Sequence, residues 1–274
     1  MNRMDDSLDA RYLQILIDCI EVSRSHRPKF GQGGKKGLSL DEFQSLYQAD
    51  PFYNWLGLDH PLMYAAHKAS SGITSVYRQI GTGCELLFRQ LLQDHLGLTP
   101  EQARWSHTEV TPFGQTRELK LDGRIELNDV IDPHRRQIIQ TWMLSAAQRL
   151  QVQPRMAQAL RGVVMEVRQG YKSKDSKRQN ADVDNAAAIF KHGYLPVLVV
   201  FSTQIDADVV QRYQRGDWLV LLGTVENDPY TSTYAFARDI LGYDLMAFFR
   251  RNQDRLKTLT EALLQSLLRA DHDD

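Results

Sequence analysis

Two short, almost wholly apolar runs constrain the fold of this chain more than any other feature. They are YLPVLVVFS at residues 194–202 and DWLVLLGT at residues 217–224. Apolar runs that do not alternate with polar residues belong in the buried middle of a sheet that is covered on both faces. The sequence therefore predicts a central sheet with helices packed on each side.

Further segments predict strands that carry polar residues. Residues 118–127, ELKLDGRIEL, alternate apolar and polar side chains, which is the period of a strand with one polar face. Residues 161–170, RGVVMEVRQG, form a short β-branched run with one acid, Glu166. Helical patterns follow or separate these strands at residues 132–152, 177–190, 232–252 and 254–268. This order predicts an α/β protein with a mixed central β-sheet flanked by helices.

The amino-terminal part of the chain indicates helices instead. Residues 8–20 have amphipathic spacing, and residues 74–96 are firmly helical in pattern. Ser39 and Glu42 have the spacing of a capping box, which predicts a short helix there. Thr99, Pro100 and Gln102 supply a start signal for another short helix.

A linker divides the chain. Residues 28–37, PKFGQGGKKG, hold four glycines and a proline, so they break the helical pattern. We expect an N-terminal helical extension with this Gly/Lys-rich linker at residues 1–75. One principal core with the C-terminal helices is expected at residues 76–274.

Composition excludes several classes of protein. The 274 residues are 42% apolar and 24% charged, so the chain can bury a sizeable core without a disulfide or a metal. Cys19 and Cys84 lie in helical patterns, and His107, His134 and His192 are scattered, so no zinc cluster is indicated. No run resembles a signal peptide or a membrane span. We expect a cytoplasmic protein with no membrane partner.

Charge is balanced overall but unevenly distributed. The net charge is −1, from 33 basic and 34 acidic residues. Residues 24–36 nevertheless hold five Lys and Arg and no acid, and residues 172–178 hold four against one acid. Such clusters suggest one electropositive face, although a solvated surface is the alternative interpretation.

Asp122 and Glu166 are the candidate catalytic pair. Each is a carboxylate on a predicted strand, and the helix between the strands allows both to lie side by side. Two neighbouring carboxylates repel each other, so a divalent cation is their natural partner, and an oxygen-only site with open positions suits Mg²⁺. The alternative is that both are exposed strand residues with ion-pair partners.

These segments resemble a known family. The runs LKLDGRIEL, GVVMEVRQGYKSKDSKRQNAD and YLPVLVVFSTQID are similar to the PD-(D/E)XK nuclease core, and the stretch from about residue 76 to 250 resembles a type II restriction endonuclease. The resemblance implies a restriction-endonuclease-like core that cleaves double-stranded DNA with Mg²⁺. It also implies that Asp122 is the first acid, that Glu166 is the second, and that the carbonyl of Val167 contacts the metal.

The chain departs from the family pattern at the motif lysine, because Arg168 stands two positions after Glu166. In a strand Arg168 points to the same face as Glu166, where it could orient water or phosphate, but a guanidinium cannot readily act as a base. Gln169, Lys172 or Lys174 could substitute.

The family also often carries a glutamate on the helix before the first catalytic strand. Glu85 matches that position, and a solvent-facing helical acid is the alternative.

A basic stretch after the second acid is the candidate DNA contact. Lysines suit phosphate contacts, whereas Arg, Gln and Asn suit bidentate contacts to base edges. The residues concerned are Lys172, Lys174, Lys177, Arg178, Gln179 and Asn180. The alternative is a polar helix start exposed to water.

The resemblance thus implies a site-specific, Mg²⁺-dependent endodeoxyribonuclease of a prokaryotic restriction system. The resemblance implies a homodimer, since two copies related by a twofold axis cut a palindromic site symmetrically, and a DNA methyltransferase encoded nearby. Two alternatives stay open. One is a structure-dependent repair or recombination nuclease on the same core, and the other is a DNA-binding module whose nuclease core has decayed.

Overall fold

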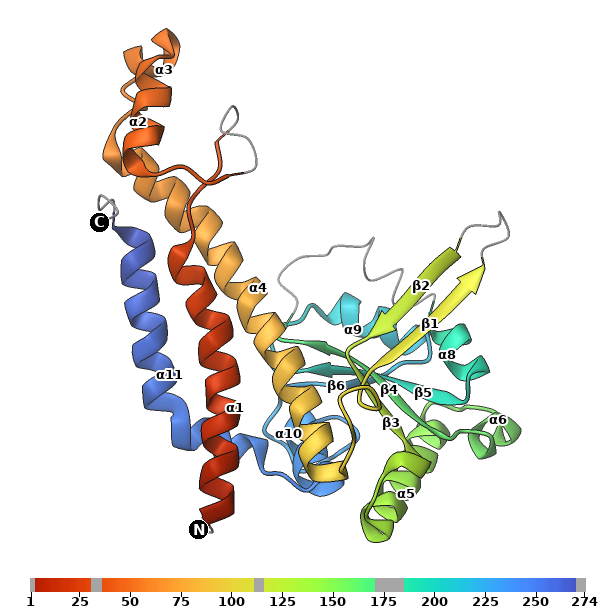
Figure 1. The fold of residues 1–274 in the computed structure, drawn as a ribbon. Coiled ribbons are helices and arrows are strands. Elements are labelled where there is room, and N and C mark those ends of the chain that lie inside the picture. Colours follow the sequence, from red (N-terminus) through yellow and green to blue (C-terminus); the bar gives the residue numbers. More distant parts are fainter. Residues whose placement is uncertain (1–2, 31–35, 111–115, 171–184, 270–274) are drawn as a thin grey trace. The chain divides into compact units, whose positions relative to one another are not determined.

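The computed structural model describes residues 3–30, 36–110, 116–170 and 185–269 (Figure 1). The chain forms two compact units. Unit 1 comprises Met1–Gly83 with Arg251–Asp274, and unit 2 comprises Cys84–Arg250. The sequence pattern places a boundary at residue 75 and the last helix with the core, and in the structure the described residues from Arg251 onward group with unit 1.

Unit 1 is helical. Its elements are α1 (Arg3–Glu21), the 3₁₀ turn η1 (Val22–Ser25), α2 (Leu40–Gln48), α3 (Pro51–Trp55), the first part of α4 (Pro61–Leu96) and most of α11 (Leu245–Leu268). The predicted capping box of Ser39 and Glu42 is formed and begins α2. The helix predicted at residues 74–96 begins earlier in the structure, at Pro61. α4 therefore extends beyond the segment whose apolar spacing predicted it.

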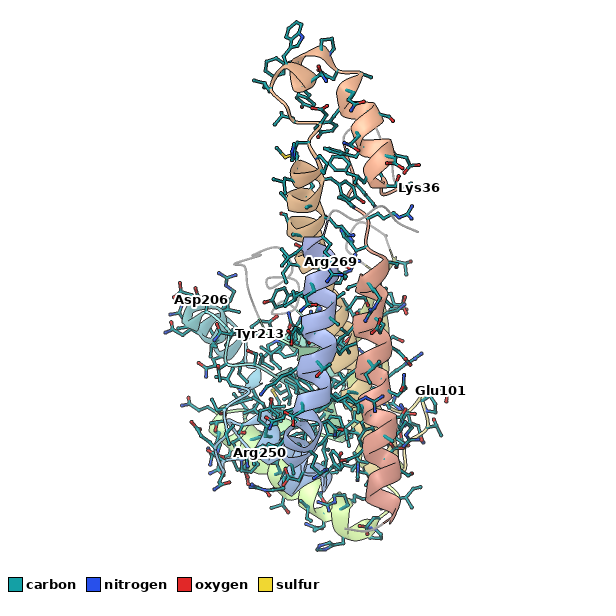
Figure 2. All side chains as sticks on the ribbon, turned by 90° about the vertical axis from the view of Figure 1, so that its left-hand side faces the viewer. Lys36, Glu101, Asp206, Tyr213, Arg250 and Arg269 are labelled. Atoms are coloured by element: carbon teal, nitrogen blue, oxygen red, sulfur yellow. The ribbon has the colours of Figure 1, made fainter. Side chains whose placement is uncertain are left out.

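Apolar stripes and one ion pair hold the helices of unit 1 together. Ile20, Val76, Leu263 and Leu267 form a buried cluster from α1, α4 and α11. At Gly72 an added Cβ would lie 2.6 Å from the Leu267 side chain, so glycine permits the close approach of α4 and α11. Arg251 on α11 pairs with Asp9 on α1 (Nε–Oδ2 2.7 Å), and these two helices lie side by side (Figure 2).

A four-stranded mixed sheet forms the centre of unit 2. Its strand order is β3 (Gly123–Glu126), β4 (Gly162–Arg168), β5 (Tyr194–Val200) and β6 (Leu219–Leu221), with β3 antiparallel to β4 and the other pairs parallel. The predicted α/β class with a mixed sheet is confirmed. Every residue of β5 is buried, as its unbroken apolar run predicts.

The strand predicted at residues 118–127 is divided in the structure. β2 (Thr116–Leu121) pairs with β1 (Trp105–Val110) in a separate antiparallel ribbon, and β3 begins at Gly123 in the central sheet. Leu127 already belongs to a 3₁₀ turn, η3 (Leu127–Asp129). The prediction of one continuous strand was wrong, because apolar alternation runs across Asp122 without marking the change of sheet.

Helices pack against the sheet, as predicted. On one side, Val164 and Leu198 of the sheet join Ile189 of α8 (Ala186–Lys191) and Tyr213 of α9 (Ala207–Arg215) in one buried cluster. Asp206 caps α9, and both Asp206 and Tyr213 are labelled in Figure 2. Each such fully buried apolar side chain stabilises the fold by roughly 1.5–3 kcal/mol.

Further helices complete unit 2. α5 (Pro133–Arg149) begins at the predicted Asp132 cap and contacts β4, and its Trp142 packs on Phe236 with ring centroids 4.7 Å apart. The remaining short elements are α6 (Pro154–Gln158), α10 (Thr233–Ala235) and the π-helix η4 (Phe236–Leu241).

Two predicted helix boundaries were wrong. The final break was predicted at residue 253 but falls at Gly242, whose left-handed conformation (φ 90°) ends η4 before α11 starts. Thr99 and Gln102 form their reciprocal hydrogen bonds, yet only a turn follows, not a helix. Over the described residues, no helix is both long and apolar enough to cross a bilayer.

Candidate active site

The candidate site lies within unit 2, where three elements bring together the predicted acids. Glu85 comes from α4, Asp122 from the junction of β2 and β3, and Glu166 from β4. All three carboxylates surround the guanidinium of Arg168, also on β4. The structure therefore brings together Glu85, Asp122, Glu166 and Arg168.

Strand register places Asp122 beside Glu166. Gly123 pairs with Met165, so the next position along β3 and β4 sets Asp122 opposite Glu166. The Val167 N–H donates to Asp122 Oδ2 over 2.8 Å, which fixes the carboxylate against β4. An added Cβ at Gly123 would lie 3.2 Å from the Leu92 side chain, so glycine suits the close packing of α4 here.

Arg168 occupies the centre of this arrangement. Its side chain is 11% exposed and contacts the Glu166 carboxylate, whose side chain is 6% exposed. Arg168 Nη1 also lies 3.8 Å from Glu85 Oε1, 4.0 Å from Asp122 Oδ2 and 3.4 Å from the Val167 carbonyl oxygen. Four oxygen donors thus converge on one cationic group.

Burial makes this ion cluster energetically sensitive. Charges removed from water need compensation, and removal of one partner of a buried pair typically costs about 3–5 kcal/mol because it leaves the other charge uncompensated. Glu166 is the most buried of the three acids, with 5% of the residue exposed. Arg168 is therefore the main compensation for Glu166 in this structure.

Arg89 belongs to the site but was missed in the sequence. Its Nε–H donates to the main-chain carbonyl of Asp122 over 2.9 Å. Burial lowers the pKa of the Arg89 guanidinium, Arg104 lowers it further, and Asp122 and Glu85 act in the opposite direction. The available signal was spacing, since Arg89 stands four residues after Glu85 and so lies on the same face of α4.

The donor set fits a hard divalent cation in its chemistry. Three carboxylates and the Val167 carbonyl are the oxygen ligands that Mg²⁺ takes, and all four lie around one point, which Arg168 marks. In the described part of the chain, no group of three or more His, Cys, Asp or Glu side chains is arranged to hold a metal ion. In this structure the three carboxylates contact the Arg168 guanidinium instead.

Of the remaining predicted site residues, the structure describes Gln169 alone. Gln169 follows β4 directly, and no hydrogen bond or ion pair of its side chain appears among the described residues. The predicted DNA-contacting residues Lys172, Lys174, Lys177, Arg178, Gln179 and Asn180 lie at 171–184, outside the described residues. Lys172 as a further catalytic candidate lies outside them as well.

Two of the scattered histidines meet in the structure. His107 Nε2 lies 3.1 Å from His192 Nε2, and the ring centroids are 3.9 Å apart. His134 lies elsewhere, in the first turn of α5, so the three histidines do not form a cluster. No third metal-ligating side chain joins the pair within the described ranges.

Comparison with known proteins adds no family to this geometry. No protein-family model matches the chain, and no curated protein or solved structure shows significant similarity to it.

Proposed function

We propose that the protein is a Mg²⁺-dependent, sequence-specific endodeoxyribonuclease of the restriction type, with a restriction-endonuclease-like core. The observation that carries this proposal is the convergence of Glu85, Asp122, Glu166 and the Val167 carbonyl on one point next to Arg168. The strongly basic stretch at residues 172–178 follows β4 in the chain within a few residues of this point. Acidic groups for a cation and basic groups for phosphate are thus neighbours in sequence.

The reaction is hydrolysis of a phosphodiester. A water oxygen forms a bond to phosphorus, the bond from phosphorus to the leaving deoxyribose oxygen breaks, and one end keeps the phosphate while the other becomes a hydroxyl. When bound, Mg²⁺ would supply Lewis-acid activation of the water and would shield charge on the phosphodiester. Glu85, Asp122, Glu166 and the Val167 carbonyl would hold it. Arg89, bound to the Asp122 carbonyl, holds that residue in position.

Arg168 has a role different from that of a motif lysine. Its guanidinium stays protonated, so it cannot accept the proton of the water. Its planar fork instead matches two phosphate oxygens, which makes it a phosphate-positioning group once the carboxylates have another cation. A proton acceptor must then come from elsewhere, and Lys172 and Lys174 stay as the proposed alternatives. Gln169, the remaining candidate for this position, could orient the water through its amide but cannot take up its proton.

A second candidate function is favoured by the same residue. Because Arg168 already compensates the three acids, the cluster is satisfied without metal, as expected for a DNA-binding module whose nuclease activity has decayed. Such a module would bind DNA tightly and in a salt-sensitive manner, without cutting it.

Digestion of mixed-sequence DNA with Mg²⁺, followed by mapping of the ends, tests the proposal. Discrete fragments with a common end sequence support it, and Asp122→Asn and Glu166→Gln should then abolish cutting. Glu101→Gln is the matched control, because Glu101 is an exposed acid of the same unit. Full activity in Asp122→Asn would refute the site. Cutting only at junctions, flaps or ends would select the repair nuclease, and tight binding without cutting would select the decayed module.

Partners follow from this proposal. A homodimer related by a twofold axis would cut both strands of a palindromic double-stranded DNA site. Sedimentation of the protein with a duplex of the mapped sequence should then give two copies per duplex. A DNA methyltransferase gene beside this one would support host protection and a prokaryotic restriction system.

A further inference from the structure

A second polar site lies in unit 1. Along α4 the residues Lys68, Ser71, Ser75 and Arg78 are spaced by three, four and three positions, which places them on one face of the helix. The segment that leaves α1 packs on this face. Ser23 of η1 is fully buried, and its Oγ lies 3.3 Å from the Oγ of the buried Ser75.

His26, which follows η1, is fixed on the same face. Its Nε2 lies 2.8 Å from Ser71 Oγ. The Ser71 hydroxyl donates its proton to the main-chain carbonyl of His67 over 2.7 Å, so it can accept a hydrogen bond from His26. This orients the imidazole, and within the described residues its Nδ1 has no hydrogen-bond partner.

Cations gather around this imidazole. Lys68 and Arg78 share the face of α4 on which Ser71 holds His26, and Lys29 follows His26 by three residues. Burial lowers the pKa of His26, and Arg78, Lys29 and Lys68 each lower it further. Lys68 is only 9% exposed, an unusual degree of burial for a lysine. No hydrogen bond or ion pair of Lys29, Lys68 or Arg78 is present in the described parts of the chain.

Like charges held together in a partly buried place destabilise one another unless an anion joins them. We propose that this cationic corner, defined by His26, Lys29, Lys68 and Arg78, is a binding site for a phosphate group. A phosphate has enough charge and enough acceptor oxygens for several ammonium, guanidinium and imidazole donors at once. Lys68, the most buried of the three cations, would contact the phosphate where water is least accessible. Lys29 and Arg78, which are exposed, would contact it from the solvent side.

The phosphate could belong to a DNA backbone or be free in solution. The proposed phosphate site does not depend on the nuclease proposal. Only the assignment of that phosphate to a DNA backbone rests on it. Phosphate contacts of this kind position a protein on DNA without reading sequence. Two measurements separate the sources.

The first measurement is titration calorimetry of the whole protein with inorganic phosphate, together with the NMR signals of the His26 ring. Binding should shift the His26 signals, which are assigned by their loss in His26→Gln. Lys68→Met should weaken phosphate binding by at least about tenfold, as expected for loss of one charge-assisted contact. Lys257→Met, an exposed lysine of the same unit, should have no effect. Arg78→Gln, at an exposed position, serves if Lys68→Met does not fold.

The second measurement is binding of a mixed-sequence duplex to the Asp122→Asn protein, with and without Lys68→Met. Weaker duplex binding in the double variant, with competition by phosphate, identifies the DNA backbone as the source. If phosphate binds but Lys68→Met leaves the duplex affinity unchanged, the ligand is free phosphate. If the protein then binds no DNA at all, the result counts against the nuclease proposal and not against the phosphate site. If phosphate does not bind, or if Lys68→Met and Arg78→Gln bind it as well as the unaltered protein, the proposal for the corner is overturned.

Discussion

The carboxylate cluster of unit 2 and the cationic corner of unit 1 are charge-unbalanced in opposite senses. Around Arg168, three acids share one contacting guanidinium, which the chain itself supplies. Around His26, three cations gather and no carboxylate contacts them within the described residues. The first site holds its own counter-ion, whereas the described part of the chain supplies none to the second.

This difference determines what each site can do. If the acids bind a metal ion as proposed, they exchange the internal cation Arg168 for an external one, and the cluster would have two compensated states, one of which needs no ligand. The corner has no internal counter-charge among the residues that the structure describes, so we expect an external anion to relieve the repulsion among its charges. A metal ion should therefore displace Arg168 from the carboxylate cluster of unit 2. A phosphate should bind to the cationic corner of unit 1 without displacing any residue.

The largest expected effect is on catalysis in unit 2. Asp122→Asn and Glu166→Gln keep the size of each side chain but remove a charge that the cation requires. We expect cleavage to fall by at least about a hundredfold, comparable with loss of a main electrostatic contact in other active sites, while Glu101→Gln cuts normally. Single-turnover cleavage of the mapped site measures this. Equal rates in all three variants would remove the acids from the chemistry.

The second largest expected effect is on stability when Arg168, the cation that the chain supplies to the acids, is removed. Arg168→Met leaves the buried Glu166 without its contacting charge, so without divalent ions the free energy of unfolding should fall by about 3 kcal/mol. Mg²⁺ should restore much of this loss, and the variant should bind Mg²⁺ more tightly than the unaltered protein. Chemical unfolding with EDTA or Mg²⁺, and metal titration calorimetry, measure both effects.

The control for this exchange is Arg168→Lys, which keeps a cation and should keep most of the stability. A stable Arg168→Met protein that ignores Mg²⁺ would contradict the idea that the acids can exchange Arg168 for a metal. It would not affect the prediction for Asp122, because that variant is tested by cleavage.

The fold was predictable where the signal is local. The apolar runs of β5 and β6 and the caps of α2 and α5 depend on neighbouring residues, and the structure confirms each of them. Strand β1 and the division at Asp122 were missed, because an edge strand is defined by its partner and not by its own pattern. The place of residues 251–274 likewise depends on packing with distant helices.

The candidate site was predictable in its residues but not in its contacts. Asp122 and Glu166 follow from acids on strands, and Glu85 and Arg168 from the family resemblance. That Arg168 contacts all three acids could not be derived from spacing, because its guanidinium reaches across three elements. Arg89 escaped notice because it binds a main-chain carbonyl, a group that every residue has.

A smaller effect is expected on the salt dependence of DNA binding. If the cationic corner neutralises a backbone phosphate, each lost contact should lower the slope of log K against log salt concentration by about 1. Lys68→Met and Arg78→Gln should each show this, and Lys257→Met should not. Affinities of the Asp122→Asn protein over a range of NaCl concentrations measure the slopes. An unchanged slope in both corner variants would exclude the DNA backbone as the source of the phosphate.

The smallest predicted effect is a pH-dependent loss of stability in unit 1. The pKa of His26 lies below its ordinary 6.5 because of burial and then Arg78, Lys29 and Lys68, so the unfolded chain binds this proton more readily. Stability from this group is therefore complete above pH 6.5 and is lost as the pH falls through the lower pKa of the folded state. Solvent screens the half-exposed ring, so the loss should stay below about 1 kcal/mol.

His26→Gln should remove this part of the acid dependence, since glutamine can still donate to Ser71 but does not titrate. His67→Gln, at an exposed histidine, is the control and should leave the dependence unchanged. Urea unfolding at about pH 5 and about pH 7.5, on either side of the histidine range, measures the difference. Added phosphate should reduce it in the unaltered protein, because an anion among the cations favours protonated His26. An acid loss that neither His26→Gln nor phosphate alters would mean that the charges around His26 are too well solvated to require an anion, and the contrast with the carboxylate cluster would fail at its weaker side.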